Sequence, residues 1–438
     1  MSGAAPRRLW RGGGQVMLGN AASAGLGLVL LFVLARALPP EGLALVLAVL
    51  AVIDGGQMFL DATVNTGMIN VAAREGRGGV PDAAVLKAGF LLKLGFGAAY
   101  ALAVAALAHP LSVAMTGDGA LAGPILLAGP AAAVAGLYGF TQARLTAAEA
   151  FATLSVLSLS KNLLRLGLVG AVLLVAGPDP RLAAMALGLA AVASCALGVW
   201  LTDWSFLRAA APVAAPMRRL MAVNGWLMVA ALAMLAGRYD VWLVGWLSDA
   251  AEAGRFALAA QLCVGMGIFT QTLVTTLLPT VSRFGAAGEV AGFLRAAARA
   301  AGPLLLVPLL AWPLAHPVLG LVFGPDYAAA AGVFAVLFLG SVMTLVGAPL
   351  MLMLLSIGAA RIIALAAGLQ MALKLAAAAA LVPAMGGVGM GLADIFGRLV
   401  AMALITGVIL AALRRARGSI GGAAGGLPCG SAGGIADA

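Results

Sequence analysis

The run FATLSVLSLSKNLLRLGLVGAVLLVA, residues 151–176, is long and apolar enough to cross a bilayer, yet Lys161 and Arg165 lie near its middle. A spanning helix needs about 20 predominantly apolar residues. A cation at the centre of such a helix costs roughly 2.5–3.5 kcal/mol, whereas each leucine or valine returns only about 0.3–0.6 kcal/mol. The two cations must therefore face a polar cavity or a partner rather than lipid.

Apolar runs of similar length recur along the whole chain. The sequence is 63% hydrophobic and 10% charged, with a mean hydropathy of +1.08, which lies outside the range of soluble domains. The runs are continuous rather than alternating, which favours helices over a β-barrel. We expect an all-helical integral membrane protein with about twelve transmembrane helices, at residues 15–36, 43–72, 86–107, 120–142, 151–176, 182–202, 221–247, 256–280, 300–322, 328–357, 361–383 and 387–413.

The basic residues are distributed unevenly about these spans. With a cytoplasmic N-terminus, 17 of the 26 lysines and arginines fall at cytoplasmic ends, three fall in outer loops (Arg36, Arg181, Arg255), and six lie within spans. Short cytoplasmic loops are enriched in lysine and arginine, so the split predicts that both termini are cytoplasmic. It also explains the net charge of +10 without nucleic acid as a partner.

The expected organisation is two lobes of six helices each. An N-terminal lobe (1–202) and a C-terminal lobe (221–413) are joined by a cytoplasmic linker (203–220), and a Gly- and Ala-rich cytoplasmic tail (414–438) is expected to be flexible. Six helices per lobe allow parallel repeats of the kind seen in transporters. No catalytic motif is present, and the three cysteines have neither metal nor disulfide spacing. We therefore expect a transporter rather than an enzyme, with no cofactor and no metal.

A polar stripe marks residues 151–176. Ser158, Lys161, Asn162 and Arg165 have offsets of 0, 3, 4 and 7, which place them on one helical face. Two like charges at i,i+4 repel each other when unpaired, so the stripe needs two acidic partners or one anionic ligand. We favour a cavity lined by these side chains; the alternative is a shallower helix in which Lys161 reaches to the cytoplasmic end.

A second stripe, on residues 43–72, carries Asp54, Gln57, Asp61 and Asn65 on one face. Asp54 and Asp61 are candidates for coupling transport to protons or Na⁺. They could equally be the counter-charge for the cations of residues 151–176, and the sequence leaves both interpretations open.

Five further charged residues within the apolar spans are candidates for a role. Arg238, Lys93 and Lys374 are candidate cations of a substrate path, and the last two could instead extend to the membrane surface. Asp394 and Arg398, at i,i+4, are expected to form a structural ion pair. The excess of cations over carboxylates within the spans indicates a negatively charged substrate.

Several motifs resemble one known family. FVLARALPPEGLALVLAVLAVIDGGQMFLDATVNTGMINVAAR (Phe32–Arg74) resembles the opening of oligosaccharide and polysaccharide flippases of the multidrug/oligosaccharidyl-lipid/polysaccharide (MOP) exporter superfamily. YDVWLVGWLSDAAEAGRFALAAQL, VFGPDYAAAAGVFAVL and LVPAMGGVGMGLADIFGRL resemble later motifs of that family, in the expected order. The usual Leu-Gly-Pro-Glu appears here as Leu38–Pro39–Pro40–Glu41.

The resemblance implies two six-helix lobes around a central cavity, as in MATE-like proteins. It further implies a flippase that moves undecaprenyl-diphosphate-linked oligosaccharide across the bacterial inner membrane by alternating access, for lipopolysaccharide or exopolysaccharide biosynthesis, with other polysaccharide assembly proteins as partners. One alternative is a cation-coupled multidrug exporter of the same superfamily, with Asp54 or Asp61 as its coupling site. A membrane polysaccharide polymerase or ligase is a further alternative, which the short outer loops disfavour.

Overall fold

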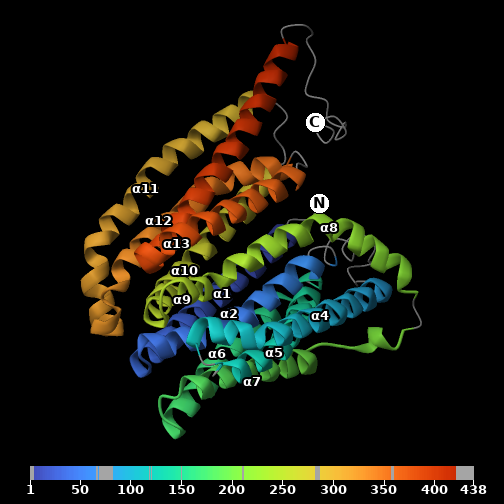
Figure 1. Cartoon of the computed structure of the whole chain (residues 1–438). Helices are drawn as coiled ribbons and strands as arrows, with labels where there is room; N and C mark the ends of the chain where they lie inside the picture. Colours follow the sequence, from blue (N-terminus) through green and yellow to red (C-terminus); the bar gives the residue numbers. More distant parts are fainter. Residues whose placement is uncertain are drawn as a thin grey trace. The chain divides into compact units, whose positions relative to one another are not determined.

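The computed structural model describes residues 4–65, 68, 82–117, 119, 121–148, 150–209, 212–281, 287–356 and 360–420 (Figure 1). These residues are helical or lie in short connections, and no strand occurs among them. The expected all-helical fold class is confirmed. Contacts divide the chain into two compact units, Met1–Ala257 and Leu258–Ala438. The predicted lobe boundaries, with a linker at 203–220, stay a prediction.

The first unit contains the longer series of helices. They are α1 (Ala4–Ala37), α2 (Pro40–Leu60), a π-helical turn η1 (Asp61–Asn65), α4 (Ala83–Thr116), α5 (Ala122–Ala147), α6 (Phe151–Val175), α7 (Pro180–Leu201), a 3₁₀ turn η3 (Ser205–Leu207), α8 (Ala214–Ala236), a 3₁₀ turn η4 (Gly237–Tyr239) and α9 (Asp240–Leu247). Helix α10 (Ala250–Val281) begins in the first unit and continues into the second. The second unit also holds α11 (Ala287–Phe323), the 3₁₀ turn η5 (Pro325–Tyr327), α12 (Ala330–Ser356) and α13 (Ala360–Ile420).

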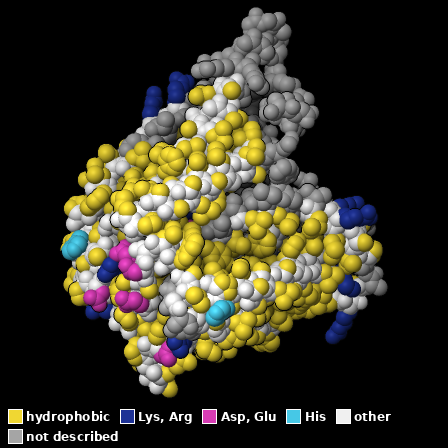
Figure 2. Space-filling model, in the orientation of Figure 1, with side chains coloured by type: hydrophobic (Ala, Val, Ile, Leu, Met, Phe, Trp, Pro, Cys, Tyr) yellow, Lys and Arg dark blue, Asp and Glu magenta, His cyan; other side chains and the backbone are white. Residues whose placement is uncertain are grey.

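Most predicted spans fall on one of these helices as far as the described residues extend, but the span 43–72 continues from α2 into η1, and the span 221–247 is divided among α8, η4 and α9. Eight helical stretches are long and apolar enough to cross a membrane by themselves, counted over the described residues. The longest, Ile362–Ala411, covers most of two predicted spans, because α13 is two helices joined at Gly386 with non-helical torsion angles (φ 54°, ψ −135°). Figure 2 shows hydrophobic side chains over much of the visible surface, as expected for a multi-pass membrane protein.

Local sequence explains where several helices begin and end. Pro40 and Pro180 occupy the first turns of α2 and α7, where a missing N–H costs nothing. The Asp82 side chain caps α4 by accepting the N–H of Ala84, and Gly117 ends that helix in the left-handed conformation. These residues fix where the helices begin and end. They therefore help to position the charged side chains that α2 and α4 carry.

Within the first unit, α5 is the helix around which the others gather. It packs against α2, α4 and α7, while α6 packs against α1 and α7. Small residues allow the close approach: a Cβ on Gly136 would lie 2.3 Å from Leu60 Cδ1 of α2. The polar faces of α2, α4, α5 and α6 can therefore meet inside one unit.

Candidate functional site

Five charged side chains from three helices of the first unit form one polar network. They are Asp54, in the C-terminal half of α2, Asp61, at the start of η1, Lys93 of α4, and Lys161 and Arg165 of α6. Gln57 joins the two halves of the network, since its Nε2 donates to Asp61 at 3.4 Å and its Oε1 accepts from Lys161 at 2.7 Å. The two stripes predicted from the sequence therefore face each other.

The α6 half of the network centres on Asp54. The guanidinium of Arg165 donates to both carboxylate oxygens of Asp54, at 2.5 and 3.2 Å. Lys161 Nζ lies 3.8 Å from the same carboxylate and 5.5 Å from the centre of the Tyr138 ring. Two cations thus share one carboxylate. The Nε atom of Arg165 is buried and has no hydrogen-bond partner among the described residues, so one donor of this half is unused.

Long side chains bridge α2 and α6. The two helices are not among the closely packed pairs of the described residues, so Lys161 and Arg165 reach across to Gln57 and Asp54. The side chain of Asp54 is 31% exposed, whereas that of Arg165 is 8% exposed. A carboxylate with this exposure can be approached from outside without unpacking the helices.

The α4 half is more enclosed. Lys93 is 1% exposed, and its Nζ donates to Asp61 at 2.6 Å and to the carbonyl oxygen of Gly136 at 2.8 Å. Asn65 closes the arrangement by donating to Asp61 at 2.9 Å and to the Gly139 carbonyl oxygen at 3.2 Å. Lys93 does not extend to the membrane surface. It pairs one to one with a carboxylate, as a structural ion pair would.

The sequence interpretation missed two side chains of this region. Gln142 of α5 donates to Ser158 at 3.1 Å and to the hydroxyl of Tyr138 at 3.4 Å, and Tyr138 donates to the Leu157 carbonyl oxygen. Tyr138 and Gln142 are polar residues at i,i+4 in the apolar run 120–142, and this spacing could have identified them from the sequence. They fix the start of the α6 stripe beside α5.

The second unit contains a smaller charged cluster. Asp394 accepts from Arg398 Nε at 2.6 Å and lies 3.2 Å from Lys374 Nζ, so the predicted i,i+4 pair has a third member. Arg398 also donates to the Thr344 hydroxyl of α12. The side chain of Arg238, the remaining candidate cation, lies outside the described part of the structure.

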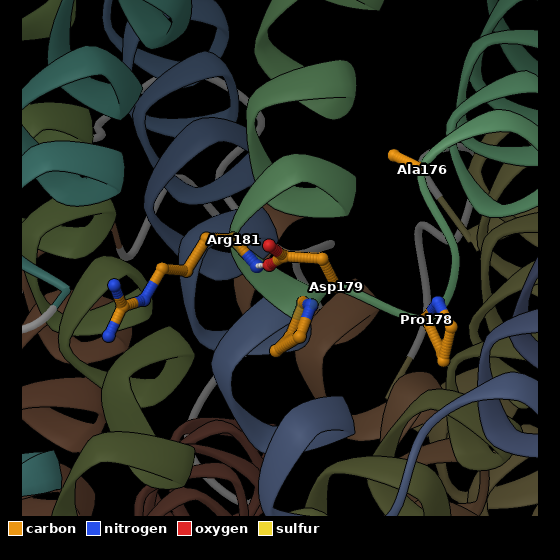
Figure 3. Close-up of a pocket in the computed structure, with 5 residues that line it drawn as sticks. Ala176, Pro178, Asp179 and Arg181 are labelled. Atoms are coloured by element: carbon orange, nitrogen blue, oxygen red, sulfur yellow. Dashed lines mark hydrogen bonds between the residues drawn. The ribbon is translucent and has the colours of Figure 1, made fainter.

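A surface depression lies elsewhere, where α6 meets α7. Figure 3 shows its lining, which includes Ala176, Pro178, Asp179 and Arg181. The Asp179 carboxylate accepts the backbone N–H groups of Arg181 and Leu182, and thereby caps α7. Eleven residues of helix separate this depression from Arg165, about 16 Å along α6, so it is separate from the charged network.

Comparisons with known proteins place the fold. The family model described as polysaccharide biosynthesis protein matches residues 9–284. A comparison with curated proteins finds no match.

Among solved structures, the chain is similar to an inward-facing multidrug resistance MATE family transporter of the MOP superfamily. The TM-score is 0.75 at 16% identity, covering 90% of this chain and 96% of that one. It is also similar to the lipid II flippase MurJ in an inward-closed conformation, with a TM-score of 0.68 at 12% identity, covering 90% and 87%. A third similar structure is a MOP superfamily transporter from Pyrococcus furiosus, with a TM-score of 0.60 at 15% identity, covering 93% and 95%. At these identities the likeness establishes the fold.

Proposed function

This chain belongs to the polysaccharide biosynthesis protein family, and we propose that it is a flippase for undecaprenyl-diphosphate-linked oligosaccharide. Its fold is that of MOP-superfamily transporters, and its helices make it a multi-pass membrane protein. In the proposal it resides in the bacterial inner membrane with both termini in the cytoplasm. There it works with other polysaccharide assembly proteins in lipopolysaccharide or exopolysaccharide synthesis.

One observation carries the proposal: Lys161 and Arg165 share the single carboxylate of Asp54, and Arg165 Nε is an unused donor. The described network holds three cations against two carboxylates, so it retains one positive charge in an apolar surrounding. Guanidinium groups suit phosphate because their planar fork matches its oxygens. The diphosphate of the substrate supplies the missing negative charge.

The proposed mechanism is an exchange of anions. With no substrate bound, Asp54 holds Lys161 and Arg165 in place and lowers the cost of their burial. The diphosphate displaces Asp54 from the two cations, and Asp54 takes them back when the substrate leaves. Lys93 and Asp61 keep their one-to-one pair while the diphosphate is bound, and so position α2 against α4 and α5. Alternating access of the two predicted lobes then carries the diphosphate across.

The coupling of transport is proposed at the same carboxylates. Asp54, when displaced, becomes a site for a proton or a Na⁺ ion, and Asp61 is the second candidate. A cation-coupled multidrug exporter of the same superfamily would use such a carboxylate directly on a cationic drug. That class is the alternative function, and its substrates have the opposite charge.

Transport by the purified full chain in lipid vesicles tests the proposal. Each charge-assisted hydrogen bond contributes about 1.5–3 kcal/mol, so we expect Lys161→Ala and Arg165→Ala each to reduce flipping of a labelled lipid-diphosphate oligosaccharide by roughly tenfold or more. Asp54→Asn and Asp61→Asn are measured with and without a proton or Na⁺ gradient. Normal flipping by both Asn variants, independent of a gradient, would remove the coupling role.

The matched control is Arg181→Ala, an exposed arginine at the start of α7, which should flip substrate normally. The amount of folded protein must be measured for every variant. A parallel loss of folded protein and flipping in the Lys161 and Arg165 variants would favour a structural role. Export of cationic dyes with no flipping would favour the drug exporter.

A further inference from the structure

The polar side chains of α6 are confined to one half of the helix. The N-terminal half carries the stripe of Ser158, Lys161, Asn162 and Arg165, whereas residues 166–175, which complete the helix, are all apolar or glycine. The two cations lie where these halves meet. A ligand beside α6 therefore meets hydrogen-bonding groups on one side of the cations and only hydrocarbon on the other.

Asn162 is the member of the stripe that the charged network leaves unused. It lies one turn before Arg165 on the same face, about 4.5 Å along the helix axis, and it is half-buried. Its side chain makes no hydrogen bond with the other described residues. Polar side chains in membrane helices usually bond across to a neighbouring helix. The amide of Asn162 instead keeps two donors and one acceptor for a ligand.

The depth of Asn162 excludes a contact with the membrane surface. The residue lies eleven positions after Phe151 and thirteen before Val175, the two ends of α6, which corresponds to about 16–20 Å of helix on either side. Long lysine and arginine side chains can extend toward a surface from such a position, but the short side chain of asparagine cannot. The amide must therefore be satisfied within the protein.

Gln142 of α5 supplies a second neutral group beside the stripe, where α5 and α6 lie next to each other (Figure 1). Its Nε2 donates to the hydroxyls of Ser158 and Tyr138, at 3.1 and 3.4 Å, and this fixes the orientation of the amide. Its Oε1 accepts no hydrogen bond from the described residues. Beyond Ser158 the stripe is covered, since a Cβ on Gly19 of α1 would lie 2.9 Å from Ser155 Cβ. The free neutral groups therefore lie next to the two cations.

We infer that Asn162 and Gln142 bind the first sugar of the lipid-linked oligosaccharide, through its hydroxyl or acetamido groups. The inference rests on the proposed function, since it takes the diphosphate to lie at Lys161 and Arg165. The first sugar is bonded directly to the diphosphate, so it lies next to whatever holds the diphosphate. Only the polar half of α6 can replace the hydrogen bonds that the sugar makes with water.

Two lipids that differ only in the sugar test the inference. Binding to the purified full chain in detergent is measured for undecaprenyl diphosphate and for undecaprenyl diphosphate that carries one N-acetylglucosamine, which has both hydroxyl and acetamido groups. The wild-type chain should bind the sugar-bearing lipid more tightly. Asn162→Ala should weaken binding of that lipid about threefold to tenfold, as the loss of a neutral hydrogen bond would, and should leave binding of undecaprenyl diphosphate unchanged.

The matched control is Ser160→Ala, on the opposite face of α6, where the hydroxyl already donates to the Val156 carbonyl oxygen. Equal binding of the two lipids by the wild-type chain would overturn the inference without any variant, and so would a preference that Asn162→Ala retains. The folded amount of Asn162→Ala should equal that of the wild type, and a lower amount would assign Asn162 a structural role instead. Failure of the proposed function gives a different result, in which neither lipid binds or Arg165→Ala binds both as tightly as the wild type.

Discussion

Single residues of α5 determine how closely the charged helices approach. The Gly139 carbonyl oxygen accepts from Asn65, and a Cβ built on Gly139 would lie 2.0 Å from Asp61 Oδ1. The Lys93–Asp61 pair therefore occupies the space that any side chain at position 139 would need. A motif search gives no reason to select this glycine, because it lies between Tyr138 and Phe140 in an apolar run that contains several other glycines.

Gly139→Ala should consequently destabilise the protein. Overpacking of this kind costs about 1–3 kcal/mol, and displacement of Asp61 would also weaken its pair with the buried Lys93. Thermal unfolding of the purified protein measures the effect. Gly167→Ala on α6 is the control, since its Cβ would have no atom within 4 Å. Equal stability of the two variants would show that Asp61 can move without cost.

At the scale of helices, the spacing of polar residues predicts which side chains share a helical face. It does not predict which other helix that face contacts. The offsets along residues 151–176 and 43–72 placed Lys161 with Arg165, and Asp54 with Asp61, on common faces, and the structure brings these faces together. The sequence offered Asp54 and Asp61 as counter-charge for these cations but left that role open. It could not assign Arg165 to Asp54, which is 111 positions away, and the Gly136 carbonyl oxygen that holds Lys93 carries no side-chain signal. For the same reason the sequence showed Lys374 as a lone charge. Its partner Asp394 lies in the other half of α13, and the turn within that helix brings the two side chains together.

The break in α13 is the element on which the second cluster depends. Gly386 has φ 54° and ψ −135°, a combination that side chains disfavour. Two close approaches follow from the break: a Cβ on Gly389 would lie 2.4 Å from the Leu381 carbonyl oxygen, and one on Gly397 would lie 2.6 Å from that of Gln370. The turn at Gly386 therefore sets the distance between Lys374 and Asp394.

Gly386→Ala should strain this turn by about 1–3 kcal/mol. The expected result is a lower midpoint of thermal unfolding. The control is Gly368→Ala in the same helix, where a Cβ would meet no atom within 4 Å and alanine is the better helix former. A Gly386→Ala protein as stable as this control would contradict the assigned backbone conformation.

For the whole molecule, the structure describes how the helices pack, whereas the distribution of basic residues in the sequence predicts how they are oriented in the membrane. The structure gives the helices and their packing inside each unit. The distribution of lysine and arginine predicts the orientation, because basic residues are retained on the cytoplasmic side. The connection after α7 contains Arg208, and the first turns of α8 contain Arg218 and Arg219, whereas η5, between α11 and α12, contains Asp326 and no basic residue. These two connections should therefore lie on opposite sides.

Cysteine accessibility in intact cells measures this orientation. Cys195, Cys263 and Cys429 are first replaced by alanine, and single cysteines are then introduced as Arg208→Cys and Asp326→Cys, both exposed positions. A membrane-impermeant maleimide should label position 326 in intact cells, and position 208 only after the membrane is opened, because the arginines near residue 208 predict a cytoplasmic location for it. Labelling of both positions from the same side would contradict twelve spans, since an odd number of crossings between residues 208 and 326 is what the arrangement requires.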